Sequence, residues 1–141
     1  MALGAVGVVA AILIPNFLGA KERAQRHRTL SDMRQIAGAV ESYRGRHGGA
    51  PAAADIGELA AALQPHLDPV PTTDGWGHPL RYGCVVPAGE VCGSYRLVSA
   101  GRDGELEVSA LAVYGPDDVA SRGYDSDLVL ADGVFWRMPD S

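Results

Sequence analysis

The chain has 141 residues, enough for one compact domain, and carries a formal net charge of −5. This acidic balance argues against a nucleic-acid-binding protein, because neutralising phosphates requires clustered lysine and arginine. Basic residues do gather between Lys21 and Arg28, where they either face an anionic surface or form a solvated side of a helix.

The chain opens with an apolar run from Met1 to Ile14, and its first charged residue is Lys21. A helical membrane span needs about 20 apolar residues, so the run is slightly short and is interpreted as the remainder of a longer span. A cleavable signal peptide would begin with basic residues and end at a small-residue cleavage site, and neither is clear here. A buried core helix is a further alternative. We predict a membrane and filament stalk over residues 1–20, with its contacts at Val8, Val9, Ile12, Leu13, Ile14, Pro15, Phe17 and Leu18.

Helical periodicity begins after Asn16. Its apolar stripe has a spacing of three or four and consists of Leu30, Met33, Ile36, Ala37, Val40 and Tyr43. Two glycines, at 48 and 49, followed by Pro51 give a stop signal. The pattern predicts a helix over about 17–47 that continues the apolar run as one rod, loosened locally at Pro15.

The remaining sequence predicts a short helix and then strands. Asp55 and Glu58 have the spacing of a capping box ahead of an apolar segment that ends before Pro65 or Pro69. Three Asp-Gly pairs, at 74, 103 and 132, predict turns. The predicted strands cover 80–86, 94–99, 107–114, 128–131 and 134–138. The fold class is therefore α+β, a long N-terminal helix packed on an antiparallel sheet of about three to five strands, with residues 21–141 forming the head.

Cys84 and Cys92 lie close together in a segment rich in turn residues. They either form a disulfide across a hairpin, which implies an oxidising compartment such as the periplasm, or stay unpaired in a cytosolic protein. The sequence contains no Cys-x-x-Cys motif, so a zinc site is not expected.

Several segments together resemble the major pseudopilin of type II secretion, and the broader type IV pilin family shares the first of them. They are residues 14–18, 31–36, 41–43, 73–82 and 95–104, of which the Asp-Gly-Trp-Gly-x-Pro sequence beginning at Asp74 is the most specific. The resemblance implies a type IV pilin-like fold with its helix half buried in the bacterial inner membrane. It also implies a periplasmic head and assembly into a short filament.

The implied partners are further copies of the chain, the minor pseudopilins and the inner-membrane assembly platform; nucleic acid is not expected. One alternative is a type IV pilin for motility, adhesion or DNA uptake. Another is a membrane-anchored periplasmic binding module that does not polymerise. Catalytic motifs such as Gly-x-Ser-x-Gly or a phosphate-binding loop are missing from the sequence, so we expect no enzyme and assign no catalytic residues.

Two features of the family bear on specific residues. Its mature members begin with a methylated aromatic residue, followed shortly by a glutamate, whereas here Met1 lies directly within the apolar run. We expect a truncated or engineered start, with an atypical subunit as the alternative. The resemblance also implies a calcium site, for which the matching turn offers Ser99 and Asp103. Asp125 and Asp127 form an alternating pair downstream that would complete it, although the family's loop is usually shorter. These aspartates alternatively form turns and loop caps.

Overall fold

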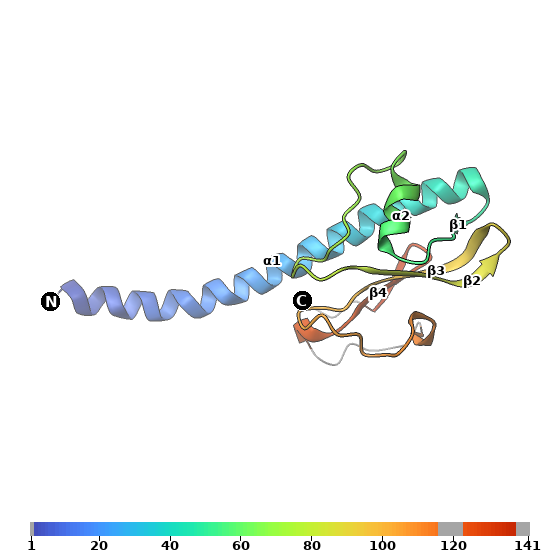
Figure 1. The fold of residues 1–141 in the computed structure, drawn as a ribbon. Helices are drawn as coiled ribbons and strands as arrows, with labels where there is room; N and C mark the ends of the chain where they lie inside the picture. Colours follow the sequence, from blue (N-terminus) through green and yellow to red (C-terminus); the bar gives the residue numbers. More distant parts are fainter. Residues whose placement is uncertain (1, 116–122, 138–141) are drawn as a thin grey trace.

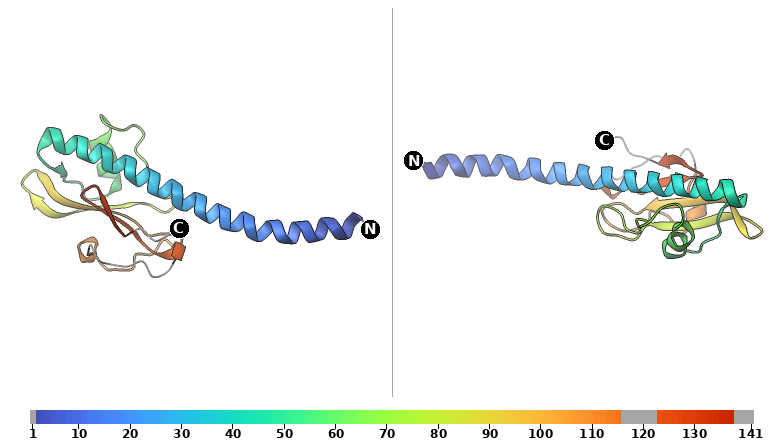
Figure 2. Two further views of the ribbon diagram at one scale, coloured as in Figure 1. Left: turned by 180° about the vertical axis from the view of Figure 1, so that it is seen from behind. Right: turned by 90° about the horizontal axis from the view of Figure 1, so that it is seen from above.

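The computed structural model describes the backbone of residues 2–115 and 123–137, and the side chains of 19–115 and 124–136. Helix α1 (Ala2–His47) lies along one face of an antiparallel sheet, and its N-terminal part continues far beyond the head (Figure 1). Two further views show the same protruding rod, with the head gathered around the second half of α1 (Figure 2). The predicted α+β arrangement is confirmed.

Helix α1 ends at His47, as predicted, and is continuous across Pro15. Gly48 follows with φ of 79°, and its N–H donates to the Arg44 carbonyl at 2.9 Å. A glycine in this left-handed conformation satisfies one of the last helical carbonyls without the steric cost of a β-carbon. The last turn is also basic, which complements the negative end of the helix dipole.

The predicted apolar stripe of α1 faces the sheet. Met33, Ile36 and Val40 are completely buried, and Tyr43 packs against the same core from its edge. Burying each large apolar side chain contributes about 1.5–3 kcal/mol, so the stripe is a major part of what holds the second half of α1 to the head. The facing core residues include Leu59, Leu63, Leu80, Tyr95, Leu97, Leu128 and Leu130.

Short helix α2 (Ile56–Leu63) begins with the predicted cap. The Asp55 side chain accepts a hydrogen bond from the Glu58 N–H at 2.8 Å. The Glu58 carboxylate in turn accepts from the Ala54 N–H at 2.8 Å, one residue before the position that a standard capping box uses. Leu59 and Leu63, one turn apart, are buried against α1 and the sheet.

Among the described residues the sheet has five strands, and each pairing between them is antiparallel. Strand β3 is central: β2 pairs along one side of it, while β1 and β4 pair along the other, with β5 outside β4. Asp132 and Gly133 form the β4–β5 turn with φ of 51° and 86°, as an Asp-Gly hairpin requires. The strand bounds are Ala50–Pro51 (β1), Arg81–Ala88 (β2), Val91–Ser99 (β3), Leu128–Ala131 (β4) and Val134–Arg137 (β5).

The predicted strand at 107–114 is wrong. This segment contains the 3₁₀ turn η1 (Leu111–Val113) instead. Strand β3 has β2 on one side and β1 and β4 on the other, so the segment does not pair with this central strand. It crosses the face of the sheet opposite α1, where Tyr114 packs with Val98 and Val129. Met138, the predicted end of the last strand, lies outside the described residues.

Candidate functional site at the junction of helix and head

The head is fastened to α1 close to the point where the helix leaves it. We call this region the helix–head junction and define it as residues 22–29 of α1, the turn 72–79 and the loop segments 99–105 and 123–127. In Figure 1 the chain between α2 and β2 reaches back to touch α1 here. The contacts described below decide how the protruding rod is oriented relative to the head.

Asp74 organises the turn 72–79 although it is almost completely buried. Its Oδ1 accepts hydrogen bonds from the Trp76 and His78 N–H groups, both at 3.0 Å. Its Oδ2 accepts from the Ser99 hydroxyl at 2.9 Å, which ties the turn to the end of β3. A buried carboxylate is costly without such partners, so this network is what allows Asp74 to sit inside the protein.

Gly75 brings the turn into direct contact with the backbone of α1. Its N–H donates to the Thr29 hydroxyl at 2.8 Å, and that hydroxyl donates to the Gln25 carbonyl at 2.7 Å. A β-carbon at position 75 would lie 2.2 Å from the Gln25 carbonyl oxygen, so any other residue requires the turn to move away. Glycine at this position therefore serves close approach to the helix.

Two aromatic side chains complete the attachment to α1. The Trp76 ring nitrogen donates to the Glu22 carboxylate at 2.9 Å. The Arg26 guanidinium lies over the Tyr124 ring, 4.2 Å from its centroid, and the Arg26 side chain is buried. Arg26 belongs to the basic cluster that was predicted either to face an anionic surface or to form a solvated side of the helix. Arg26 does neither. It is an internal contact of the junction.

The four predicted calcium ligands come from neighbouring loop segments but serve separate contacts. Ser99 donates to Asp74, and Asp103 accepts from the Glu105 N–H at 3.0 Å. Asp125 is held in an ion pair by Arg102, with contacts of 2.9 and 3.0 Å. Asp127 is buried and accepts from the Glu107 N–H and the Tyr114 hydroxyl.

Within the described ranges, no group of three or more His, Cys, Asp or Glu side chains converges closely enough to hold a metal ion. Calcium binding by Ser99, Asp103, Asp125 and Asp127 stays a prediction. Arg102, which the sequence analysis did not single out, is the residue that organises this loop.

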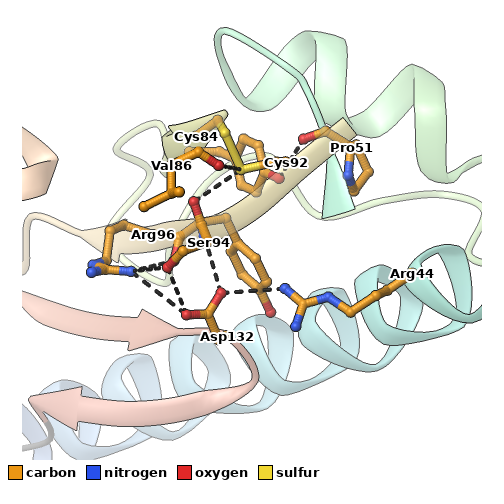
Figure 3. The surroundings of a disulfide bond; sticks show 10 residues. Arg44, Pro51, Cys84, Val86, Cys92, Ser94, Arg96 and Asp132 are labelled. Carbon is orange, nitrogen blue, oxygen red and sulfur yellow. Dashed lines mark hydrogen bonds and ion pairs between the residues drawn. A yellow bond between two sulfur atoms is a disulfide. The ribbon is translucent and has the colours of Figure 1, made fainter. Parts of the chain in front are cut away.

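Cys84 and Cys92 form a disulfide between β2 and β3, with a Cα–Cα distance of 5.7 Å (Figure 3). The predicted pairing across the hairpin is confirmed. It fixes the outer end of the β2–β3 hairpin, where the register is interrupted by irregularities after Cys84 and after Val86.

Asp132 links the far end of α1 to the sheet. As Figure 3 shows, its carboxylate lies between Arg44 of α1 and the β3 residues Ser94 and Arg96. It also accepts from the Tyr95 N–H at 3.1 Å. Burial by itself raises the pKa of Asp132, but the hydrogen bonds from Ser94, the Tyr95 N–H and Arg44 outweigh it and lower that pKa overall.

Comparison with known proteins identifies the family. No protein-family model matches the chain, and no solved structure matches it. The chain is 29% identical over 120 residues to type II secretion system core protein G of Klebsiella pneumoniae, which covers 85% of this chain and 81% of that protein. It is 30% identical over 115 residues to the protein of the same name from Pectobacterium carotovorum subsp. carotovorum, covering 79% and 67%. It is also 30% identical over 113 residues to the protein of the same name from Escherichia coli strain K12, and this match covers 72% of this chain and 74% of that protein.

The chain belongs to the type II secretion system core protein G family. These relatives bear the name of a secretion-system component and not of an enzyme. In this member of the core protein G family, the most specific segment of the resemblance, beginning at Asp74, is the turn that attaches the head to α1. Gly75 and Trp76 of this turn therefore have a structural role, as the residues that attach the head to the helix.

The predicted filament and membrane residues, from Val8 to Leu18, belong to the part of α1 that extends beyond the head (Figure 1). Among the described residues, no helix is both long and apolar enough to span a bilayer.

Sequence reasoning missed the partners that complete the junction, namely Glu22, Gln25, Thr29 and Arg102. For the three helix residues alone, the sequence contains one indication: the spacing of 22, 25 and 29 places them on one side of α1. That signal does not identify the turn that binds there.

Proposed function

We propose that this chain is a structural subunit of the periplasmic pseudopilus of the type II secretion system and supports protein export without an enzymatic activity. The observation that carries the proposal is its membership of the core protein G family, with relatives aligned over most of both chains. The shape of the molecule supports it, because a subunit of a filament needs a rod for packing and a head held in a fixed position on that rod.

Physical chemistry explains how such a subunit would work. Apolar rods lower their free energy by burying one another, so the segment from Val8 to Leu18 would form the core of the filament. The helix–head junction would then transmit the position of each rod to its head, because Gly75, Trp76 and Tyr124 hold the head to α1 at several points.

We further propose that the subunit resides in the inner membrane with its head in the periplasm before assembly. Its partners would be other copies of the chain, the minor pseudopilins and the inner-membrane assembly platform. The disulfide between Cys84 and Cys92 supports this location, because such bonds persist in oxidising compartments.

A deletion strain of the source bacterium tests the role. We expect lost export of secreted proteins with intact twitching motility, and rescue of export by a plasmid copy of the full-length gene. Intact export with lost twitching or DNA uptake would instead establish a type IV pilin.

Cross-linking in the complemented strain tests polymerisation. Cysteines placed at Leu13 and Leu18 should give a ladder of linked subunits under oxidation. Val113→Cys is the matched control, since Val113 is an exposed position in the head, 61% accessible, and reports chance collisions. A pattern of monomers alone at both rod positions would rule out a filament and favour a membrane-anchored binding module.

A further inference from the structure

Arg102 ties together the two loop segments that would have to surround a bound cation. Its guanidinium Nε contacts Asp125 Oδ1 at 2.9 Å, and Nη2 contacts Oδ2 at 3.0 Å. This two-pronged geometry is the strongest form of arginine–carboxylate pairing and needs both oxygens of the carboxylate. The Arg102 N–H also donates to the Tyr124 carbonyl at 2.8 Å, so backbone and side chain of one residue hold the same partner segment.

The charged groups around Arg102 favour the protonated, positively charged form of its guanidinium. The hydrogen bond to Asp125 and the charge of that carboxylate raise the pKa of the Arg102 guanidinium, and Glu22 and Asp103 act in the same direction. An arginine stays protonated throughout the physiological pH range, so Arg102 places a permanent positive charge among these acidic side chains. A divalent cation placed among the same carboxylates would be repelled by that charge.

The oxygens of the predicted calcium ligands do not fit a calcium ion in this arrangement. Calcium takes about six to eight oxygen ligands at flexible distances. Both Asp125 oxygens face Arg102, the Ser99 hydroxyl faces Asp74, and one Asp127 oxygen accepts from Glu107 and Tyr114. Across the described part of the chain, these side chains do not form a metal-sized cluster.

We propose that the guanidinium of Arg102 takes the place of a divalent cation in this protein. The Arg102–Asp125 pair, which we call the arginine clamp, holds segments 99–105 and 123–127 together without a bound metal. Because Tyr124 adjoins Asp125 and lies under Arg26, the clamp also keeps Tyr124 in place on α1. The clamp follows from the loop contacts alone and does not depend on the proposed role in secretion.

Thermal melting of the full chain in mild detergent tests the clamp. The wild type should melt at the same temperature in EDTA and in millimolar calcium, whereas Arg102→Ala should melt several degrees lower in EDTA. Arg46→Ala is the matched control, because it removes the same charge from an exposed arginine in the last turn of α1. A saturable rise of the wild-type melting temperature with calcium would overturn the proposal, as would an Arg102→Ala protein that melts like the wild type.

Limited proteolysis reports on the loop itself and remains informative if Arg102→Ala fails to fold. A glutamate-specific protease cuts after Glu105 and Glu107, which lie beside the clamp. Arg102→Lys keeps the charge but loses the two-pronged contact, and Asp125→Asn removes the negative partner. We expect faster cleavage of both variants than of the wild type, and no protection of the wild type by calcium. Wild-type cleavage rates in both variants, or clear protection of the wild type by calcium, would overturn the proposal.

Discussion

Gly75 lies so close to α1 that a β-carbon at this position would stand 2.2 Å from the Gln25 carbonyl oxygen. Gly75→Ala must therefore push the turn off the helix or bend the helix away. We expect the free energy of unfolding to fall by about 1–3 kcal/mol, the usual cost of overpacking a fitted contact. Urea denaturation of the full chain, followed by circular dichroism, measures the change.

Gly38→Ala is the matched control for this substitution. Gly38 is also part of α1, but a β-carbon there would have no neighbour within 4 Å. Alanine in an exposed helix interior is favoured over glycine, so this variant should gain about 0.5–1 kcal/mol. If Gly75→Ala were as stable as the wild type, the close approach of turn and helix would not hold in solution.

Trp76 and Glu22 join the turn to α1 through one hydrogen bond at 2.9 Å. Trp76→Phe keeps an aromatic ring and removes the donor, so we expect a loss of about 0.5–1.5 kcal/mol in unfolding free energy. The matching variant Glu22→Ala removes the acceptor. In a double-mutant cycle the combined loss should be smaller than the sum of the single losses; strict additivity would mean that the two residues do not interact.

The parts of the fold that rest on local chemistry were predicted correctly. The stripe of Met33, Ile36 and Val40 needs only helical spacing, and the cap of α2 needs only Asp55 and Glu58. In these cases the residues that decide the structure are neighbours in the sequence or along one helix.

The predictions that failed or were incomplete concern contacts between residues far apart in the sequence. The segment 107–114 has strand-like composition but no strand structure; it packs on the face of the sheet, with Tyr114 against Val98 and Val129. Asp74 and Asp132 were identified only as turn formers, which they are. Their carboxylates also bind groups that no local pattern identifies, such as Ser99, 25 residues from Asp74, and Arg44, 88 residues from Asp132.

The disulfide between Cys84 and Cys92 closes a short loop, with a sequence separation of 8. Constraining the unfolded chain in this way contributes about 2–3 kcal/mol by the chain-entropy estimate. Replacing both cysteines by alanine should lower the free energy of unfolding by that amount, as measured by urea denaturation. Reduction of the wild type with dithiothreitol should give a similar loss, whereas the alanine variant should not respond. A wild type indifferent to the reductant would contradict the prediction.

Asp132 gives the stability a defined dependence on pH. The lowered pKa of its carboxyl means that the folded state favours the charged form more than the unfolded state does. Its contribution is therefore fully present above the ordinary aspartate pKa of about 3.9, and it is lost as the pH falls through the folded value. Asp132→Asn tolerates the left-handed turn conformation but cannot ionise, so its unfolding free energy should vary less across this acidic range.

Urea midpoints of the wild type and Asp132→Asn, taken from neutral pH down through the carboxylate range, test this expectation. The two curves should converge on acidification, because protonation removes from the wild type the charge that the variant already lacks. Ser94→Ala provides an intermediate case, since it removes one of the hydrogen bonds that lower the Asp132 pKa but leaves Arg44 in place. Parallel curves for wild type and Asp132→Asn would mean that the carboxylate bridging α1 and the β4–β5 turn does not contribute through its charge.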